Sequence, residues 1–337
     1  MVYVLAPAKR RSVGRRLGLV SAFFLLAGAL PARAQFTQLY DLTVAGGRNP
    51  YGGPVIKDGF IYDVAVRGGA SNDGVVYRIK TDGTGYTVLH HFTGADGGYP
   101  YAGMVRKGKT LFGVCSGGGA SGLGTVFKIK TDGTGFAVLH DFDVVANGYY
   151  PTGKLVYDAV TDFLYGTTRY GGMNIVGTIF RIRRTGADFA VIKHLAAATG
   201  ATPYAGLVLH GGKLFGHTYG GGTSGAGVVF RVKPSGGGYT VIRHFAGGAG
   251  DGAYGNYGSL VSDGSFLYGM TTYGGAGGVG NVYKINGSGT VFSTLHEFAG
   301  ADGYVPYGGL LRMGSTLYGM TQYGGANSVG VLFKVMT

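Results

Sequence analysis

The chain of 337 residues contains no tryptophan, one cysteine (Cys115) and one glutamate (Glu297). A single cysteine excludes an intramolecular disulfide, so packing alone must hold the fold together. Hydrolysis by paired carboxylates needs two suitably placed acidic side chains. Most of the fifteen aspartates fall in turn-like sequences, which leaves few acids for that chemistry. No glycine-rich stretch leads into a helix, so a phosphate-cradling loop is not predicted.

Acidic residues are absent from residues 1–34, which hold six of the 29 lysines and arginines. A basic start is followed by the uncharged apolar run Leu17–Leu30 and by the sequence PARA before Gln35. This order is typical of a secretory signal peptide, and the run is shorter than the roughly 20 residues of a membrane-spanning helix. We therefore predict cleavage after residue 34 and an exported protein, periplasmic or extracellular, with no membrane span thereafter.

Removal of that segment lowers the formal net charge from +13 to +7, because all 16 acids lie beyond it. There is no arginine-rich tract and no nucleic-acid-binding motif, so nucleic acid is not a predicted partner.

Glycine is abundant, with 70 residues, and it recurs in a repeated pattern. The clearest copies are residues 267–283 (LYGMTTYGGAGGVGNVY) and 317–333 (LYGMTQYGGANSVGVLF). Weaker copies begin at residues 61, 111, 164 and 214, so the spacing is 50 or 53 residues throughout. A period near fifty residues is typical of radial or stacked β-repeats.

Each period contains four short apolar runs, which in the second unit are 103–105, 110–115, 125–129 and 136–142. They are rich in β-branched and aromatic residues and too short for helices, so they predict four strands. Tight Asp-Gly-type turns join strand one to two and strand three to four. The longer glycine-rich links between strands two and three, and from strand four to the next unit, must then share one face. We call it the long-loop face.

The two ends of the repeat array complement each other. Residues 36–42 (FTQLYDL) match the fourth strand of later units, such as 136–142 (FAVLHDF), and the sequence stops after the third strand of the sixth unit. Since an open array leaves two unpaired edges, the sequence predicts an all-β, closed six-bladed β-propeller in which residues 36–42 complete the last blade. The predicted propeller spans 35–337, with repeat cores near 51–92, 101–142, 152–195, 204–245, 257–298 and 307–337.

The repeated L-Y-G-M-T-x-Y-G-G, the K/R-I of strand three and the V-L-H-x-F of strand four resemble the bacterial GloVer tandem repeats across nearly all of residues 36–337. That resemblance implies an exported, propeller-like protein and carries over no catalytic residue. The period is also similar to that of kelch repeats, although their tryptophan-containing motif is absent.

Tyrosines mark the long-loop face, where aromatic rings suit stacking on sugars. A packing role between blades is the alternative interpretation. The predicted ligand-binding residues are Tyr51, Tyr101, Tyr204, Tyr257 and Tyr307 before strand one, and Tyr170, Tyr273 and Tyr323 after strand two. The leading hypothesis is a monomeric binding module for carbohydrate or another extracellular protein.

Five residues break the repeat along strand two or at its end: Asp63, Arg67, Cys115, Arg169 and His217. Together they supply an acid, a nucleophile, a base and two cations, so they are the catalytic candidates of an alternative, polysaccharide-active lyase or hydrolase. They belong to different blades, so a Cys–His pair is not predicted. A structural envelope protein is the third alternative.

No metal site or other cofactor is predicted. Calcium is the one ion considered, because Asp96, Asp251 and Asp302 lie in loops of the long-loop face and carboxylates are calcium ligands. Each loop supplies one carboxylate, and a single Asp-Gly is equally a turn sequence.

Overall fold

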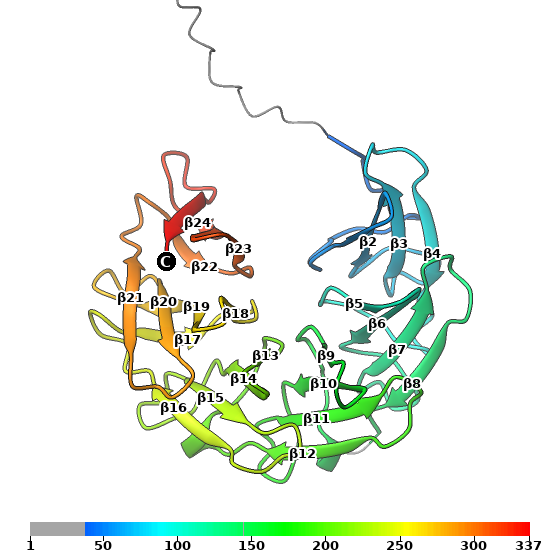
Figure 1. Cartoon of the computed structure of the whole chain (residues 1–337). Coiled ribbons are helices and arrows are strands. Elements are labelled where there is room, and N and C mark those ends of the chain that lie inside the picture. The colour runs from blue at the N-terminus through cyan, green and yellow to red at the C-terminus, as the bar shows by residue number, and fades with distance from the viewer. Residues whose placement is uncertain (1–37, 144) are drawn as a thin grey trace, which may run out of the picture. The chain divides into compact units, whose positions relative to one another are not determined.

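The computed structural model describes residues 38–143 and 145–337, which form six antiparallel sheets in chain order around a ring (Figure 1). The predicted signal peptide lies outside these residues. Within the described ranges the only helical segments are two 3₁₀ turns, η1 (Val145–Asn147) and η2 (Ala197–Thr199). None of the described segments is a helix long and apolar enough to cross a membrane. The predicted fold class, a six-bladed β-propeller, is confirmed.

The first three blades each contain four strands in sequence order. Blade 1 is β1 (Val55–Lys57), β2 (Phe60–Ala65), β3 (Val75–Lys80) and β4 (Thr87–His91). Blade 2 is β5 (Val105–Lys107), β6 (Thr110–Cys115), β7 (Thr125–Lys130) and β8 (Ala137–Asp141). Blade 3 is β9 (Val156–Asp158), β10 (Phe163–Thr168), β11 (Thr178–Arg183) and β12 (Ala190–His194). The predicted strands of the second unit are found within two residues of their expected positions.

Blade 4 follows the same plan, blade 5 has an additional strand, and blade 6 has an additional strand but no fourth strand among the described residues. Blade 4 is β13 (Val208–His210), β14 (Lys213–His217), β15 (Val228–Val232) and β16 (Thr240–His244). Blade 5 adds β17 (Gly252–Gly255) to β18 (Val261–Ser262), β19 (Phe266–Gly274), β20 (Asn281–Asn286) and β21 (Phe292–Glu297). Blade 6 is β22 (Tyr304–Pro306), β23 (Leu311–Met313), β24 (Thr316–Tyr323) and β25 (Leu332–Met336).

A β-bulge recurs between the third and fourth strands of blades 1 to 5. In blade 1, Val76 pairs with His90 and Tyr77 with Val88, so Leu89 has no partner in the ladder. A bulge bends the strand at the extra residue. Leu89 lies against the turn glycine Gly133 of the next blade, so the bulge links neighbouring blades.

The apolar core lies between the blades. The cluster joining blades 1 and 2 includes the fully buried Val64 and Phe92 from one blade and Met104 and Phe127 from the next. Four further clusters join the successive pairs up to blades 5 and 6. Complete burial of such a side chain stabilises the fold by about 1.5–3 kcal/mol, so each blade depends on its neighbours.

Among residues 38–143 and 145–337, no strand pairing joins the first and last blades, which corrects the predicted closure. Within these ranges β25 pairs only with β24, and residues 38–42 form no strand; Phe36 and Thr37 lie outside the described residues. The physical reason is that this segment packs on blade 1. Tyr40 stacks on Tyr86 with 4.2 Å between ring centroids, and Leu39 contacts Gly83 as Leu89 contacts Gly133.

A cavity of about 480 Å³ accompanies the incomplete sixth blade and is lined by His296, Phe298 and Phe333, among others. The corresponding space between blades 1 and 2 is filled by Phe136, which stacks on His90 at 3.5 Å between centroids. Blade 6 therefore leaves open, between aromatic side chains, the space that in other blades is filled by an aromatic side chain at the start of the fourth strand.

Candidate functional site

The loops that enter strand one of each blade bring one residue to the long-loop face around the ring axis. We call these six positions the axial circle: Tyr51, Tyr101, Thr152, Tyr204, Tyr257 and Tyr307. Tyr257 lies 4.3 Å from both Tyr204 and Tyr307, and Tyr51 lies 6.0 Å from Tyr101, measured between ring centroids. The phenols of Tyr51 and Tyr101 are close enough to Tyr307 to raise its pKa, although burial contributes most.

Backbone geometry fixes these loops between two blades. In blade 2, Tyr99 precedes Pro100 and has φ 57°, a left-handed conformation that is rare for a non-glycine residue. Its N–H donates to the Asp73 carbonyl of blade 1 at 2.8 Å, and its carbonyl accepts from the Ser116 N–H at 3.2 Å. These two bonds hold the backbone that precedes Tyr101.

Exposure divides the axial circle into two groups. Tyr51, Tyr101 and Tyr307 are 59%, 41% and 38% exposed, whereas Tyr204 is buried. Burial raises the pKa of Tyr257 to about 12, so its hydroxyl stays protonated at neutral pH. The circle thus presents exposed aromatic faces beside phenol groups that can donate hydrogen bonds.

Arg169, at the end of β10, stands between two tyrosines. Its guanidinium carbon is 4.7 Å from the ring centroid of Tyr170 and 4.2 Å from that of Tyr204. Cation–π contacts of this kind contribute about 0.5–2 kcal/mol. Two of the predicted binding residues and one catalytic candidate are therefore brought together.

A second group of tyrosines extends outward from this cluster. Tyr219 contacts Tyr204 at 5.3 Å and Tyr254 at 4.9 Å, and Tyr254 contacts Tyr273 at 5.9 Å between centroids. The remaining predicted residue, Tyr323, stacks on Tyr304 at 5.3 Å. The aromatic surface therefore runs from the axial circle across blades 3 to 5, with a separate pair on blade 6.

Lys154 and Asp63 influence each other from blades 3 and 1. Burial raises the pKa of the Asp63 carboxyl to about 6, while the Val64 N–H, 2.9 Å away, and the charge of Lys154 act in the opposite direction. Burial lowers the pKa of Lys154, and Asp63 partly offsets this. An acid and a base from different blades thus share an electrostatic environment at the inner end of the blades.

Replacement of Asp63 by asparagine is expected to stabilise the protein at pH 8 and less so at pH 4. The folded pKa is higher than the unfolded value of 3.8, so stability is lost as pH rises through about 4 to 6. The difference corresponds to about 2–3 kcal/mol. Thermal unfolding between pH 4 and pH 8 measures it. Equal pH profiles for Asp63→Asn and wild type would contradict the expectation, and Lys154→Met, the control, should lower stability at pH 8.

The other departures from the repeat are dispersed. Cys115 is completely buried in the cluster between blades 1 and 2, where burial raises the pKa of its thiol. His217 is buried in blade 4, and Arg67 is exposed over Tyr99, with its guanidinium carbon 4.8 Å from the ring centroid. The geometry therefore assembles no nucleophile with a base.

The contacts of His217 explain its place in the fold. Its Nδ1 lies 3.1 Å from the Tyr283 hydroxyl, and its Nε2 lies 3.1 Å from the Asn256 carbonyl oxygen. A carbonyl can only accept, so Nε2 carries the proton and Nδ1 accepts from tyrosine. Burial lowers the pKa of His217 to about 4. His217, which stands where other blades have methionine, valine or threonine, and Tyr283, which stands where most other blades have phenylalanine, thus form a hydrogen bond with each other.

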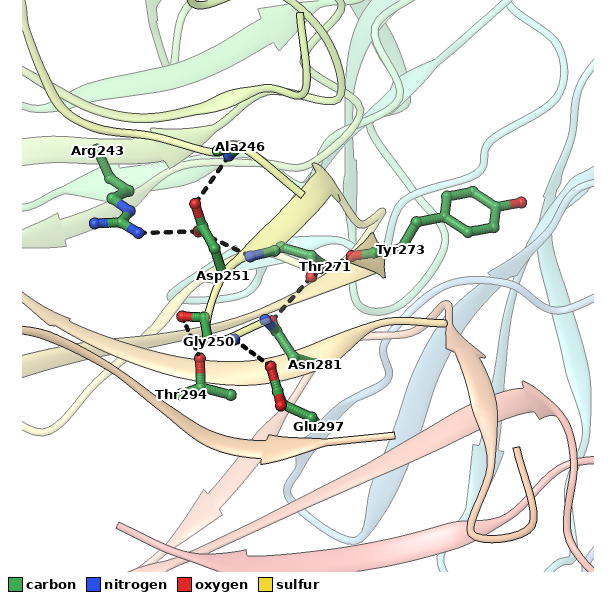
Figure 2. Close-up of polar contacts among 10 residues, drawn as sticks. Arg243, Ala246, Gly250, Asp251, Thr271, Tyr273, Asn281, Thr294 and Glu297 are labelled. Atoms are coloured by element: carbon green, nitrogen blue, oxygen red, sulfur yellow. Dashed lines mark hydrogen bonds and ion pairs between the residues drawn. The ribbon is translucent and has the colours of Figure 1, made fainter. Parts of the chain in front are cut away.

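The loop aspartates bind their own loops. Figure 2 shows Asp251 accepting from the Ala246 N–H at 2.9 Å and pairing with Arg243 at 3.1 Å. Asp251 also accepts from the Gly252 N–H at 2.8 Å. In the same view, Glu297 accepts from the Gly250 N–H at 2.6 Å. These carboxylates connect the loop to the fourth strands on either side of it.

Asp96 and Asp302 repeat this arrangement with a histidine in place of arginine. Asp96 lies 2.9 Å from His90 Nε2, and Asp302 lies 2.8 Å from His296 Nε2. Each also accepts a backbone N–H three residues before it. Across residues 38–143 and 145–337 there is no group of three or more histidine, cysteine or acidic side chains placed to hold a metal ion.

Sequence reasoning missed Lys154, Tyr219 and Tyr254. Lys154 stands where blades 2 and 4 have Gly103 and Gly206, a signal that alignment of the repeats contains. A Cβ atom at Gly103 would lie 2.2 Å from the Gly53 carbonyl oxygen, so glycine is the expected residue there. Tyr219 and Tyr254 could not be identified by aligning the repeats. They belong to the aromatic surface because Tyr219 contacts Tyr204 and Tyr254 contacts Tyr273, and these contacts are known only from the structure.

The sequence profile of the Gloeobacter/Verrucomicrobia repeat matches residues 29–219 and 161–337. The chain therefore belongs to the Gloeobacter/Verrucomicrobia repeat family, as the repeat pattern indicated. No curated protein matches it.

Solved structures show a likeness of fold. The extracellular domain of a provisionally assigned hybrid two component system from B. thetaiotaomicron is 14% identical with a TM-score of 0.55; the match covers 86% of this chain and 33% of that one. A provisionally named 6-phosphogluconolactonase from Bacteroides uniformis is 14% identical with a TM-score of 0.54, covering 85% and 84%. An oligogalacturonate lyase in complex with manganese is 10% identical with a TM-score of 0.51, covering 83% and 74%.

Proposed function

We propose that this protein is an exported, monomeric binding module that takes carbohydrate on the axial circle and the tyrosines beside it. The observation that carries the proposal is the exposure of Tyr51, Tyr101 and Tyr307 around one axis. Exposed rings of this kind stack on the apolar faces of sugar rings, and neighbouring hydroxyls bond the sugar. The basic start and apolar run of residues 1–34 support export.

The geometry gives an enzyme less support. Hydrolysis by two carboxylates needs them a few ångströms apart across the substrate, and Asp63 faces Lys154 rather than a second acid. Cys115 and His217 are buried in different blades. If the protein has a purely structural role, replacing the tyrosines of the axial circle should change no binding affinity.

Replacement of Tyr101 and Tyr307 by alanine tests the proposal. A glycan array should show binding by the wild-type protein, and each replacement should weaken it about 10-fold, since loss of about 1.4 kcal/mol is tenfold. Tyr157→Ala is the control, because Tyr157 bonds Asp162 in a tight turn away from the axial circle. Absence of glycan binding by the wild-type protein, or equal loss in the control, would refute the proposal.

A further inference from the structure

Blade 3 departs from the repeat at three positions of the long-loop face. Thr152 takes the place of the axial tyrosine, Lys154 that of a glycine, and Arg169 that of the serine, tyrosine or threonine found at 116, 219 and 272. The other five blades keep the axial tyrosine. One blade therefore exchanges an aromatic ring for two cations within an otherwise aromatic circle.

Thr152, which replaces the axial tyrosine, and Arg169 both contact Tyr204. The Thr152 hydroxyl donates to the Tyr204 carbonyl at 3.0 Å, and the Arg169 guanidinium lies over the ring of the same tyrosine at 4.2 Å. Arg169 is also close enough to lower the pKa of Tyr257 slightly against the larger effect of burial. The guanidinium therefore stands at the break in the circle, beside the stacked pair Tyr257–Tyr307.

Arg169 lacks the partners that comparable arginines have. Arg78 and Arg231 donate to the carbonyls of Thr131 and Gly287, and Arg243 pairs with Asp251. Among the described residues, the Arg169 side chain forms neither an ion pair nor a hydrogen bond, and its buried Nε lacks a partner, as do those of Arg78 and Arg243. The terminal N–H groups, which are bonded in Arg78, Arg231 and Arg243, therefore stay available in Arg169 to a ligand group.

We propose that Arg169 recognises the carboxylate of an acidic sugar whose neighbouring ring stacks on the axial tyrosines. This inference rests on the proposed carbohydrate function and names its substrate class: uronate-containing glycans. The guanidinium carbon lies over the rings of Tyr170 and Tyr204, and the terminal N–H groups remain for a ligand. These groups form a planar fork of N–H donors matching the two oxygens of a carboxylate.

Calorimetric titration of the exported protein with hexagalacturonate and with its methyl ester tests this, because the two differ only in methylation of the carboxyl groups, which removes their negative charge. The acid should bind at least 10-fold tighter than the ester, and its affinity should fall with added salt. Arg169→Met should remove the preference, because affinity for the acid should fall at least 10-fold, to that for the ester. Arg169→Lys keeps the positive charge but loses the paired N–H donors of the guanidinium, so it should retain part of the preference for the acid.

Arg181→Met is the matched control. Arg181 is also stacked on an aromatic ring, Phe163 at 4.8 Å, with a buried Nε that lacks a partner, but it lies in the middle of β11. It should leave both affinities unchanged. Equal binding of acid and ester, or an unchanged preference in Arg169→Met, would overturn the acidic-sugar assignment and leave carbohydrate binding standing. Failure of both hexamers and of every glycan on the array would overturn both.

Discussion

Deletion of residues 36–42 is expected to lower the melting temperature by about 6–12 °C. Tyr40 and Leu39 are 43% and 39% exposed, so more than half of each side chain is covered by blade 1. Loss of the Tyr40–Tyr86 stack and of the Leu39 contact should remove about 3 kcal/mol. For a domain of this size, about 1 kcal/mol shifts the melting temperature by roughly 2–4 °C. Scanning calorimetry measures the shift.

Two shorter changes show which part of the segment matters. A chain beginning at Gln38 keeps the Tyr40 and Leu39 contacts with blade 1 and should melt as wild type does. A drop as large as that of the full deletion would show that residues before Gln38 make contacts of their own. Val160→Ala, at a side chain 93% exposed, is the control that should change nothing. An unchanged melt after full deletion would contradict the role given to the segment.

The double variant His217→Met with Tyr283→Phe should resist acid better than wild type by about 3 kcal/mol. Burial holds the folded pKa of His217 at about 4, below the unfolded value of 6.5. The folded protein therefore binds this proton more weakly than the unfolded chain does. The stability is complete above about pH 6.5 and is lost as pH falls toward 4 and below.

Both substitutions place residues that other blades already use, Met at 270 and 320 and Phe at 127 and 180, so packing should tolerate them. Denaturant unfolding at pH 4 and pH 7.5 gives the difference. Because Asp63 changes stability in the opposite direction between pH 6 and pH 4, the variant is compared with wild type at each pH. His217→Met alone, which leaves the Tyr283 hydroxyl without its partner, should be less stable than the double variant. Parallel pH profiles would contradict the assignment.

Repetition made most of the fold predictable. Four strands per fifty residues, with tight and long links alternating, follow from the spacing of apolar runs and turn sequences. The bulge at Leu89 was not predicted, because nothing in V-L-H-H-F distinguishes a bulged leucine from a paired one. Closure by residues 36–42 was expected from pairing alone, whereas the contact of Tyr40 with Tyr86 holds the segment to blade 1.

The candidate site was only partly predictable. The tyrosines of the long-loop face were identified, yet their exposure ranges from buried Tyr204 to Tyr51 at 59%, which depends on packing between blades. Arg169 was grouped with Cys115 and His217, since all three break the repeat. Only their contacts distinguish them: His217 has a partner for each ring nitrogen, whereas the Arg169 guanidinium has only tyrosine rings among the residues that the structure describes.

The apolar clusters join each blade to its neighbours in the chain, so the six units can be compared with one another as related sequences are. Five of them preserve the axial tyrosine, and the glycines of blades 2 and 4 allow close approach of the inner loops. In a repeat architecture a local change affects mainly the adjoining units, so blade 3 can differ while the others keep the shared pattern. Comparison of blades within the chain therefore supplies what a set of related sequences usually does: it separates residues that build every blade from those that depart from the pattern, which are the ones to test for recognition.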